Sequence, residues 1–162
     1  MKKIICSVAV LAVLVFGACN STESAKTETA AENKALPDGA AIPFTQATHY
    51  FVRNDFKDGQ LEDPRITTKA GFDAIFGTAA TMGRDGQPTP IDFTKQDVIA
   101  VIDSVSDDAV SFENPTLQKD GDYLALSYDK TKGAKQSFST RPFLLLIIDK
   151  KYKQTVIPVI KK

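Results

Sequence analysis

Two runs of consecutive apolar residues dominate the pattern of this sequence, at residues 98–102 and 143–148. Neither run alternates with polar residues. Continuous apolar runs of this length are typical of strands that are buried on both faces of a sheet. We therefore predict two fully buried strands and place residues 98–102 at the centre of the sheet.

Shorter segments alternate between apolar and polar residues, which is the pattern of a strand with one buried face. These segments are residues 48–54, 110–112 and 123–128, and the apolar segment 156–160 is predicted as one further strand. A turn at Asp120-Gly121 joins the second segment to the third. The last segment contains Pro158, which has no backbone N–H to donate, so we place that strand at a sheet edge.

One short helix is predicted after residue 66. Its apolar face consists of Phe72, Ile75 and Phe76, which have the i, i+3, i+4 spacing of a helix. Thr67 or Thr68 can cap the start of this helix, and Gly77 suits its end.

The polar segments 78–90 and 131–140 are rich in turn residues and are predicted as long loops. The order of elements is then a strand, a helix and about five strands joined by short turns. This order predicts an α+β fold: a mostly antiparallel β-sheet or sandwich of about six strands with one short helix.

The first 18 residues have the pattern of a secretory signal. Lys2 and Lys3 precede an apolar run of thirteen residues, which is too short to span a membrane, and the small residues Gly17 and Ala18 follow it. Cys19 comes directly after this small pair, and the stretch resembles the bacterial lipobox, although Phe16 stands where leucine is usual. The resemblance implies cleavage between Ala18 and Cys19 and acylation of Cys19, with several acyl chains that anchor the protein in a membrane.

These patterns divide the chain into a signal peptide (residues 1–18), an acylated N-terminus with a disordered tether (19–42) and one globular domain (43–162). The tether is polar, with one aliphatic residue before Ile42, so it cannot bury enough surface to offset the entropy of ordering. Asn20 is not aspartate, and by resemblance to the lipoprotein sorting rule this favours the outer membrane. We therefore expect a lipid-anchored protein of the bacterial cell envelope.

Composition narrows the classes of function. Removal of residues 1–18 takes two of the 20 basic residues and none of the 20 acidic ones, which leaves a net charge of −2. Such a charge gives no field that would attract nucleic acid. Both cysteines, Cys6 and Cys19, lie outside the domain, so we expect neither disulfides nor thiol chemistry there.

Candidate catalytic residues are few. His49 is the single histidine and there is no cysteine beside it, so we expect no metal site, and the sequence contains no motif for a cofactor. The acidic residues fall in expected turns and at strand ends, where carboxylates are usually solvated. We therefore predict a protein that is not an enzyme, with hydrolysis of an envelope polymer by acids near Asp92 and Asp107 as the alternative.

Two segments are candidates for contact with a partner. The loop that contains Arg84 and Asp85 is long, and long loops in compact domains often carry function. Arg141 and Phe143 stand where a polar segment enters a buried strand, and arginine and aromatic residues are frequent anchors of interfaces. For both segments a structural role is the competing interpretation.

Several stretches together suggest a family. They are Ile66 followed by the helix of Phe72, Ile75 and Phe76, Ile91-Asp92-Phe93-Thr94-Lys95 before the central strand, Gly121-Asp122-Tyr123-Leu124, and Pro142-Phe143-Leu144-Leu145. Over residues 66–160 this pattern resembles the C-terminal domain of the protease-complex subunit PrcB family. The family tends to have a Thr-Gly-Gly-Tyr-like turn after the central strand, where this chain reads Ser106-Asp107-Asp108-Ala109-Val110.

The resemblance implies a partner, a peptidase or its complex, which this domain would engage or modulate. The hypothesis from sequence is therefore a lipid-anchored binding or accessory protein. A purely structural envelope lipoprotein is a further alternative.

Overall fold

The computed structural model describes residues 36–79, 82–83 and 86–161. The chain divides into two units, Met1–Lys34 and Ala35–Lys162, and everything below concerns the second. The predicted signal peptide, Ala18, Cys19 and most of the tether lie outside the described residues, as do Arg84 and Asp85.

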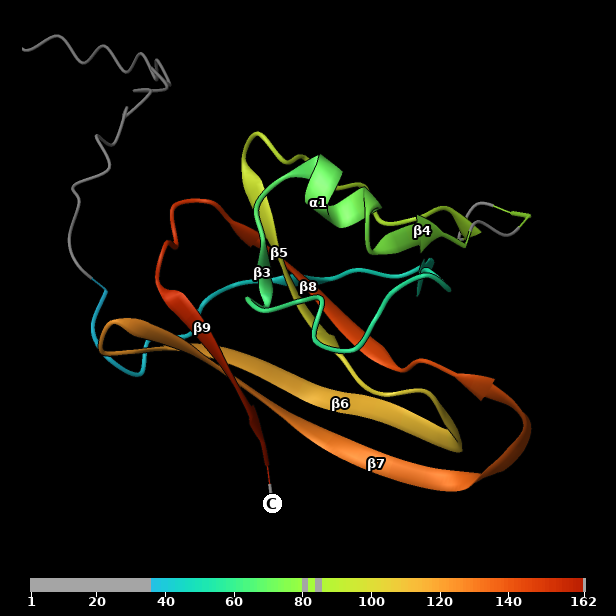
Figure 1. Cartoon of the computed structure of the whole chain (residues 1–162). Coiled ribbons are helices and arrows are strands. Elements are labelled where there is room, and N and C mark those ends of the chain that lie inside the picture. Colours follow the sequence, from blue (N-terminus) through green and yellow to red (C-terminus); the bar gives the residue numbers. More distant parts are fainter. Residues whose placement is uncertain (1–35, 80–81, 84–85, 162) are drawn as a thin grey trace, which may run out of the picture. The chain divides into compact units, whose positions relative to one another are not determined.

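The described part of the domain consists of nine strands in three sheets and one short helix (Figure 1). The elements are β1 (Thr45–Gln46), β2 (Tyr50–Val52), β3 (Arg65–Ile66), α1 (Lys69–Asp73), β4 (Phe76–Thr78), β5 (Gln96–Ile102), β6 (Ser106–Asp120), β7 (Tyr123–Thr140), β8 (Phe143–Asp149) and β9 (Thr155–Ile160). The sheets have the strand orders β1-β8-β5-β3, β2-β4 and β6-β7-β9, and every pair is antiparallel except β7 with β9. The prediction of a mostly antiparallel sheet with one short helix is confirmed, whereas the expected number of strands was too low.

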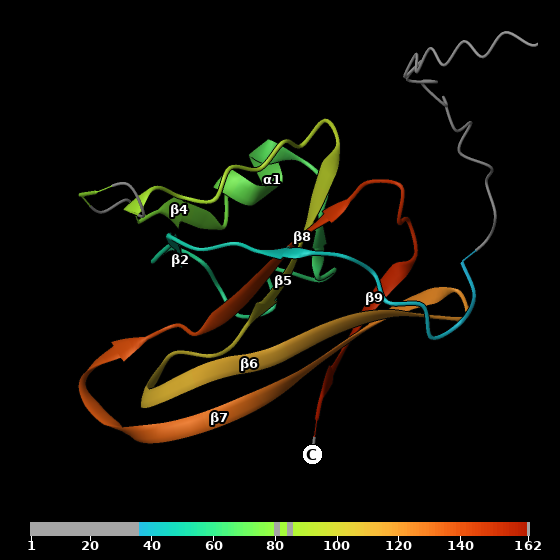
Figure 2. The ribbon, with the colours of Figure 1, turned by 180° about the vertical axis from the view of Figure 1, so that it is seen from behind.

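The antiparallel pair β5–β8 forms the middle of the domain. It runs in register from Gln96 opposite Asp149 to Ile102 opposite Phe143. The β6–β7 ribbon lies on one side of this pair, and α1 and β4 lie on the other, as Figures 1 and 2 both show. The prediction that both apolar runs are strands buried on two faces is therefore confirmed.

Alternate residues of β5 and β8 belong to two separate cores. Ile99, Leu144 and Leu146 pack against residues of β6, β7 and β9, among them Leu117 and Leu126. Their neighbours in sequence face the other way and pack against α1, β2 and β4; these neighbours are Val98, Ala100, Leu145 and Ile147. Because a strand points successive side chains to opposite faces, an uninterrupted apolar run fills both cores at once.

The second core is rich in aromatic residues. The Phe72 ring lies 5.0 Å from the Phe76 ring and 5.1 Å from that of Tyr50, measured between centroids. Burial raises the pKa of the Tyr50 hydroxyl, which donates a hydrogen bond to the Thr89 carbonyl at 2.6 Å. This hydrogen bond connects the C-terminal end of loop 79–90 to β2.

The helix begins as expected and ends sooner. The Thr68 side chain accepts a hydrogen bond from the Gly71 N–H at 3.1 Å, which confirms Thr68 as the N-cap. The helix ends at Asp73, so of its predicted apolar face only Phe72 is helical: Ile75 lies in the turn that follows, and Phe76 belongs to β4. Gly77 also belongs to β4 and is not a helix stop. The ring of Phe51, on the facing strand, covers Gly77 so closely that a Cβ there would collide with it.

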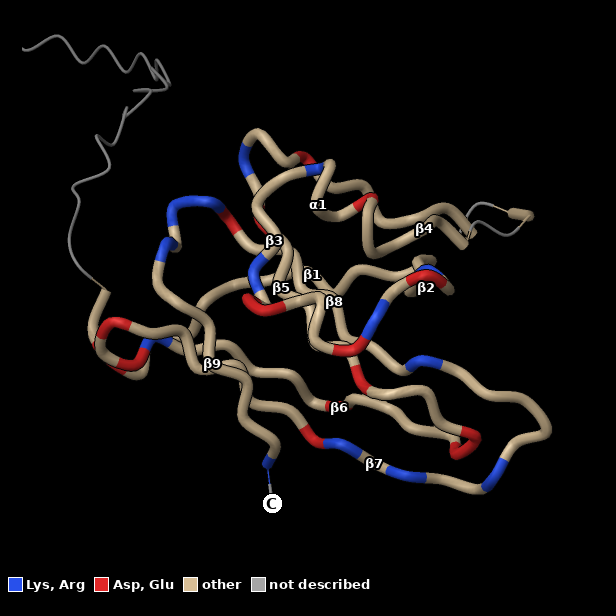
Figure 3. The backbone as a smooth tube through the Cα atoms, in the orientation of Figure 1, with Lys and Arg blue, Asp and Glu red and all other residues tan. Residues whose placement is uncertain are grey.

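The prediction of a loop at residues 131–140 is wrong, because β7 continues to Thr140 and pairs with the first half of β6. This distal part of the ribbon has no buried residue on β7, and ion pairs accompany its backbone ladder with β6. The pairs are Lys130–Asp103 at 2.5 Å, Lys132–Asp108 at 2.7 Å and Lys135–Asp107 at 2.9 Å. Figure 3 shows the basic residues along β7 and acidic residues near the start of β6.

Residues 131–140 of β7 lack an alternating apolar pattern, and their lysines pair with acidic residues near the start of β6 instead. The hydrogen bond from Lys132 lowers the pKa of the Asp108 carboxyl, because it favours the charged form of that group. Opposite charges on facing strands stabilise a ribbon, although each exposed pair contributes little. A search for apolar alternation cannot detect a strand that is stabilised in this way.

The two ends of the described segment lie on the three-stranded sheet. Strand β9 is an edge strand, as Pro158 predicted. The Ile42 N–H donates to the Leu117 carbonyl at 2.8 Å, and the Ile42 side chain is 2% exposed. Residues just before the expected domain boundary at 43 thus pack against β6.

The two-core arrangement makes a prediction about β8. Replacement of Leu145 or of Leu146 by alanine should each lower the free energy of unfolding by about 2–5 kcal/mol, because each leaves a cavity in a different core. Urea unfolding of the purified variants measures this. Ile157→Ala, at a position 43% exposed on β9, is the control and should cost no more than about 1 kcal/mol. A tolerated change at either leucine would mean that β8 has one buried face only.

Candidate functional site

A groove of about 440 Å³ opens beside the two described residues that the sequence singled out, Arg141 and Phe143. One wall is segment 51–54, which comprises the last two residues of β2 and the two residues after it. The other wall is segment 139–141, at the end of β7, with Phe143 and Val105 completing the lining. We call this the β2 groove.

Arg141 is held in place by neighbours outside the groove. Its Nη1 forms an ion pair with Asp58 and donates to the Asp103 carbonyl at 3.4 Å. Its guanidinium carbon lies 5.1 Å from the centre of the Phe56 ring, within the range of a cation–π contact. The side chain is therefore fixed at the rim and only 17% exposed, rather than freely presented.

Phe143 has a role in the core as well as in the groove. It is the first residue of β8, opposite Ile102, and its ring lies 5.6 Å from that of Phe76. The side chain is half-buried, so one part packs in the second core while the rest lines the groove.

Two exposed apolar residues complete the groove, and sequence analysis did not identify them. Phe51 is 44% exposed and Val105 is 55% exposed. The sequence pattern could have identified Phe51. The alternation of residues 48–54 places its ring on the polar face of the strand, with His49 and Arg53, and places Tyr50 and Val52 on the other face. An aromatic residue on the polar face of a strand suggests contact with something outside the core.

A second cleft, of about 480 Å³, holds the partners of Arg141. Its lining includes Phe56, Asp58, Glu62 and Asp103, over a floor from β5. Arg141 therefore lines one hollow while its ion-pair partner lines the other. The two hollows differ in charge, because the β2 groove is lined by arginines and this cleft by carboxylates.

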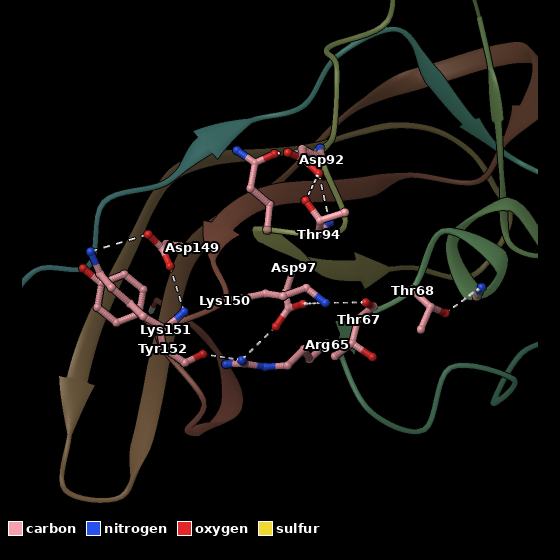
Figure 4. Close-up of polar contacts among 12 residues, drawn as sticks. Arg65, Thr67, Thr68, Asp92, Thr94, Asp97, Asp149, Lys150, Lys151 and Tyr152 are labelled. Atoms are coloured by element: carbon pink, nitrogen blue, oxygen red, sulfur yellow. Dashed lines mark hydrogen bonds and ion pairs between the residues drawn. The ribbon is translucent and has the colours of Figure 1, made fainter.

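The most buried charged group of the described chain is Asp97, at 4% exposed, which the sequence interpretation placed among solvated acids. Figure 4 shows it between Arg65 and Lys150. Its Oδ2 lies 3.4 Å from Arg65 Nη1, and its Oδ1 lies 3.2 Å from Lys150 Nζ without a well-aligned donor. Arg65 also donates to the carbonyls of Tyr152 and Gln154, so the cluster ties β3 and β5 to the β8–β9 connection and serves the fold.

The residues of the hydrolase alternative each bind separate neighbours. His49 has φ 63° and its Nδ1 lies 3.2 Å from Thr48 Oγ1. Asp92 accepts hydrogen bonds from Thr94, which lower its pKa (Figure 4), and Asp107 pairs with Lys135 on the distal ribbon. None of these three lines either hollow.

Within residues 36–79, 82–83 and 86–161, no group of three or more histidine, cysteine, aspartate or glutamate side chains could hold a metal ion. In the same described segments, no helix is long and apolar enough to cross a membrane. The chain matches no protein-family model, no curated protein and no solved structure. The resemblance to the PrcB family and the hypotheses about function therefore remain predictions.

The contacts of Arg141 with Asp58 and Phe56 predict that it stabilises the loop after β2, residues 55–64. Arg141→Met should lower the free energy of unfolding by about 1 kcal/mol, through loss of an ion pair and a cation–π contact. It should also speed hydrogen exchange at the Phe56 and Gln60 amides, which bond within that loop.

Arg53→Met is the matched control, because Arg53 pairs with Asp55 in solvent, with both side chains at least 46% exposed. It should leave both measurements nearly unchanged. Equal effects of the two substitutions would contradict a stabilising role for Arg141.

Proposed function

We propose that this protein is a lipid-anchored component of the bacterial cell envelope that binds a protein partner and is not itself an enzyme. The sequence Gly17-Ala18-Cys19 after a short apolar run supports the anchor, since it resembles a lipobox. Acyl chains on Cys19 would hold the domain at the membrane, and the tether would give it reach. With Asn20 after the cysteine, we place it in the outer membrane.

One observation supports binding best, namely the exposed Phe51 and Val105 beside two arginines in the β2 groove. Aromatic and arginine side chains are the residues most often found at the centre of protein interfaces. The PrcB resemblance suggests the class of partner, a peptidase or its complex. The hydrolase alternative lacks comparable support, because Asp92 and Asp107 are engaged by different neighbours.

The anchor is tested by replacing each cysteine in turn. Cys19→Ser should abolish incorporation of labelled palmitate and release the protein from the membrane fraction, because the thiol that accepts the lipid is gone. Cys6→Ser, in the apolar run of the signal, is the matched control and should leave labelling intact. Labelling that persists in Cys19→Ser would contradict lipidation at this residue.

The partner is tested by cross-linking in intact cells. A photoreactive amino acid at position 105, in the groove, should give a covalent product with one envelope protein, identified by mass spectrometry as a peptidase or a subunit of its complex. The same amino acid at position 157, which is 43% exposed on β9, should not. The absence of any product from position 105 would argue against a protein partner at this groove.

A further inference from the structure

We infer that the β2 groove binds an extended segment of its partner as an added strand, and that it selects a segment with an acidic residue two positions from an apolar one. This inference rests on the proposed function, because it specifies how the partner is recognised. It follows from the backbone, the charges and the exposed apolar surface of the groove.

The walls of the groove are strand edges. Successive side chains of a strand point to opposite faces, so consecutive residues can line one groove only along the edge of the strand. The β2 wall consists of the consecutive residues 51–54, and the opposite wall contains the consecutive residues 139–141. An extended chain placed along the β2 wall would meet the open backbone edge of that strand.

The hydrogen-bonding pattern of β2 shows which of its backbone groups face the groove. The Arg53 N–H donates to the Ile75 carbonyl, and the His49 carbonyl accepts from Ala79, both at 2.8 Å. Residues 49, 51 and 53 therefore bond toward β4. By the alternation of an antiparallel pair, the N–H and C=O of Val52 point away from β4, where an added strand can reach them.

The charges favour an acidic segment. Two arginines line the groove and no carboxylate does. Arg53 is bound to Asp55 only by an exposed pair at 3.4 Å, which a ligand carboxylate can displace at little cost. Arg141 is already oriented through Nη1, while its Nε and Nη2 have no acceptor among the described residues. A carboxylate that binds these donors need not order the side chain first.

The positions of the side chains define the spacing. Phe51 and Arg53 are two residues apart and point to the same face of β2. The Phe51 ring is seated on Gly77, so it offers a supported apolar surface. On an added strand, the residue opposite Phe51 should be apolar, and the residue opposite Arg53, two positions away, should be acidic.

Strand β9 offers an exposed apolar edge as well, but its backbone is unsuited to pairing. The Lys161 N–H donates to the Tyr128 carbonyl at 2.8 Å, so residues of odd number bond toward β7. Pro158 then has its nitrogen on the outer edge, where it has no hydrogen to donate. The β2 edge has no proline in segment 51–54.

The test uses two capped, fluorescent hexapeptides and the complete protein in detergent. The Glu probe is Thr-Val-Thr-Glu-Thr-Val, and the Lys probe has lysine in place of glutamate. Anisotropy should show that the Glu probe binds at least about tenfold more tightly, because the arginines form charge-assisted hydrogen bonds with it. Equal affinities of the two probes would overturn the inference.

Variants locate the binding in the groove. Arg53→Gln should weaken binding of the Glu probe about tenfold, whereas Lys57→Gln, which removes a charge outside the groove lining, should not. Val105→Asp should weaken it as well, and Ile157→Asp on β9 should not. Affinities that do not change in Arg53→Gln and Val105→Asp would overturn the inference.

N-methylation tests strand addition itself. In an added strand only alternate N–H groups bond to β2. One probe is methylated at the Glu amide and a second at the following Thr amide. The affinity of one of them should fall at least about tenfold, and the affinity of the other should fall much less. Equal losses of affinity in the two probes would show that alternate N–H groups do not bond to β2, and would overturn strand addition.

The inference and the proposed function can fail separately. A partner that cross-links to position 105 but is not competed by the Glu probe would overturn strand addition and leave the proposed function standing. The opposite result is also possible: the Glu probe binds the purified protein as expected, but position 105 cross-links to no protein in cells. That result would support the recognition mode and overturn the proposed function.

Discussion

Burial of the β5–β8 pair on both faces is the constraint on which the rest of this domain depends. The two strands are the only ones in the described structure whose successive residues supply two cores. Each face needs its own cover, which the β6–β7–β9 sheet supplies on one side and α1, β2 and β4 on the other. A domain of this size can bury such a layer only if nearly every other element lies against it.

The β2 groove exists because the elements that cover the β5–β8 pair leave one strand edge unpaired. The β2–β4 sheet has two strands, and β2 pairs with β4 alone, so its other edge stays open beside the end of β7. In loop 55–64, Phe56 and Asp58 contact Arg141 and line the second cleft, not the β2 groove. The Arg141 contacts thus stand between the two hollows, and the buried Arg65–Asp97–Lys150 cluster lies at the opposite end of β5, where it joins the sheet to the β8–β9 connection.

Apolar patterning predicted the core well and the periphery poorly. The runs at 98–102 and 143–148 had to be buried, and any fold would have placed them inside. The distal ribbon is different, because Lys130, Lys132 and Lys135 stabilise it through partners more than twenty residues away. Gly77 shows the same limit, since its place in β4 depends on a ring from β2 that local sequence does not reveal.

The sequence by itself determined where apolar surface had to be hidden, where Pro158 forced an edge, and the lipobox-like stretch on which the proposed anchor depends. These are local properties, set by the transfer of side chains from water and by the backbone chemistry of single residues. The tertiary structure alone decided that Arg141 forms an ion pair with Asp58, that Asp97 is buried, and that Phe51 and Val105 line one groove. Those contacts join residues 32 to 83 positions apart, and their energies depend on geometry that exists only after the chain has folded.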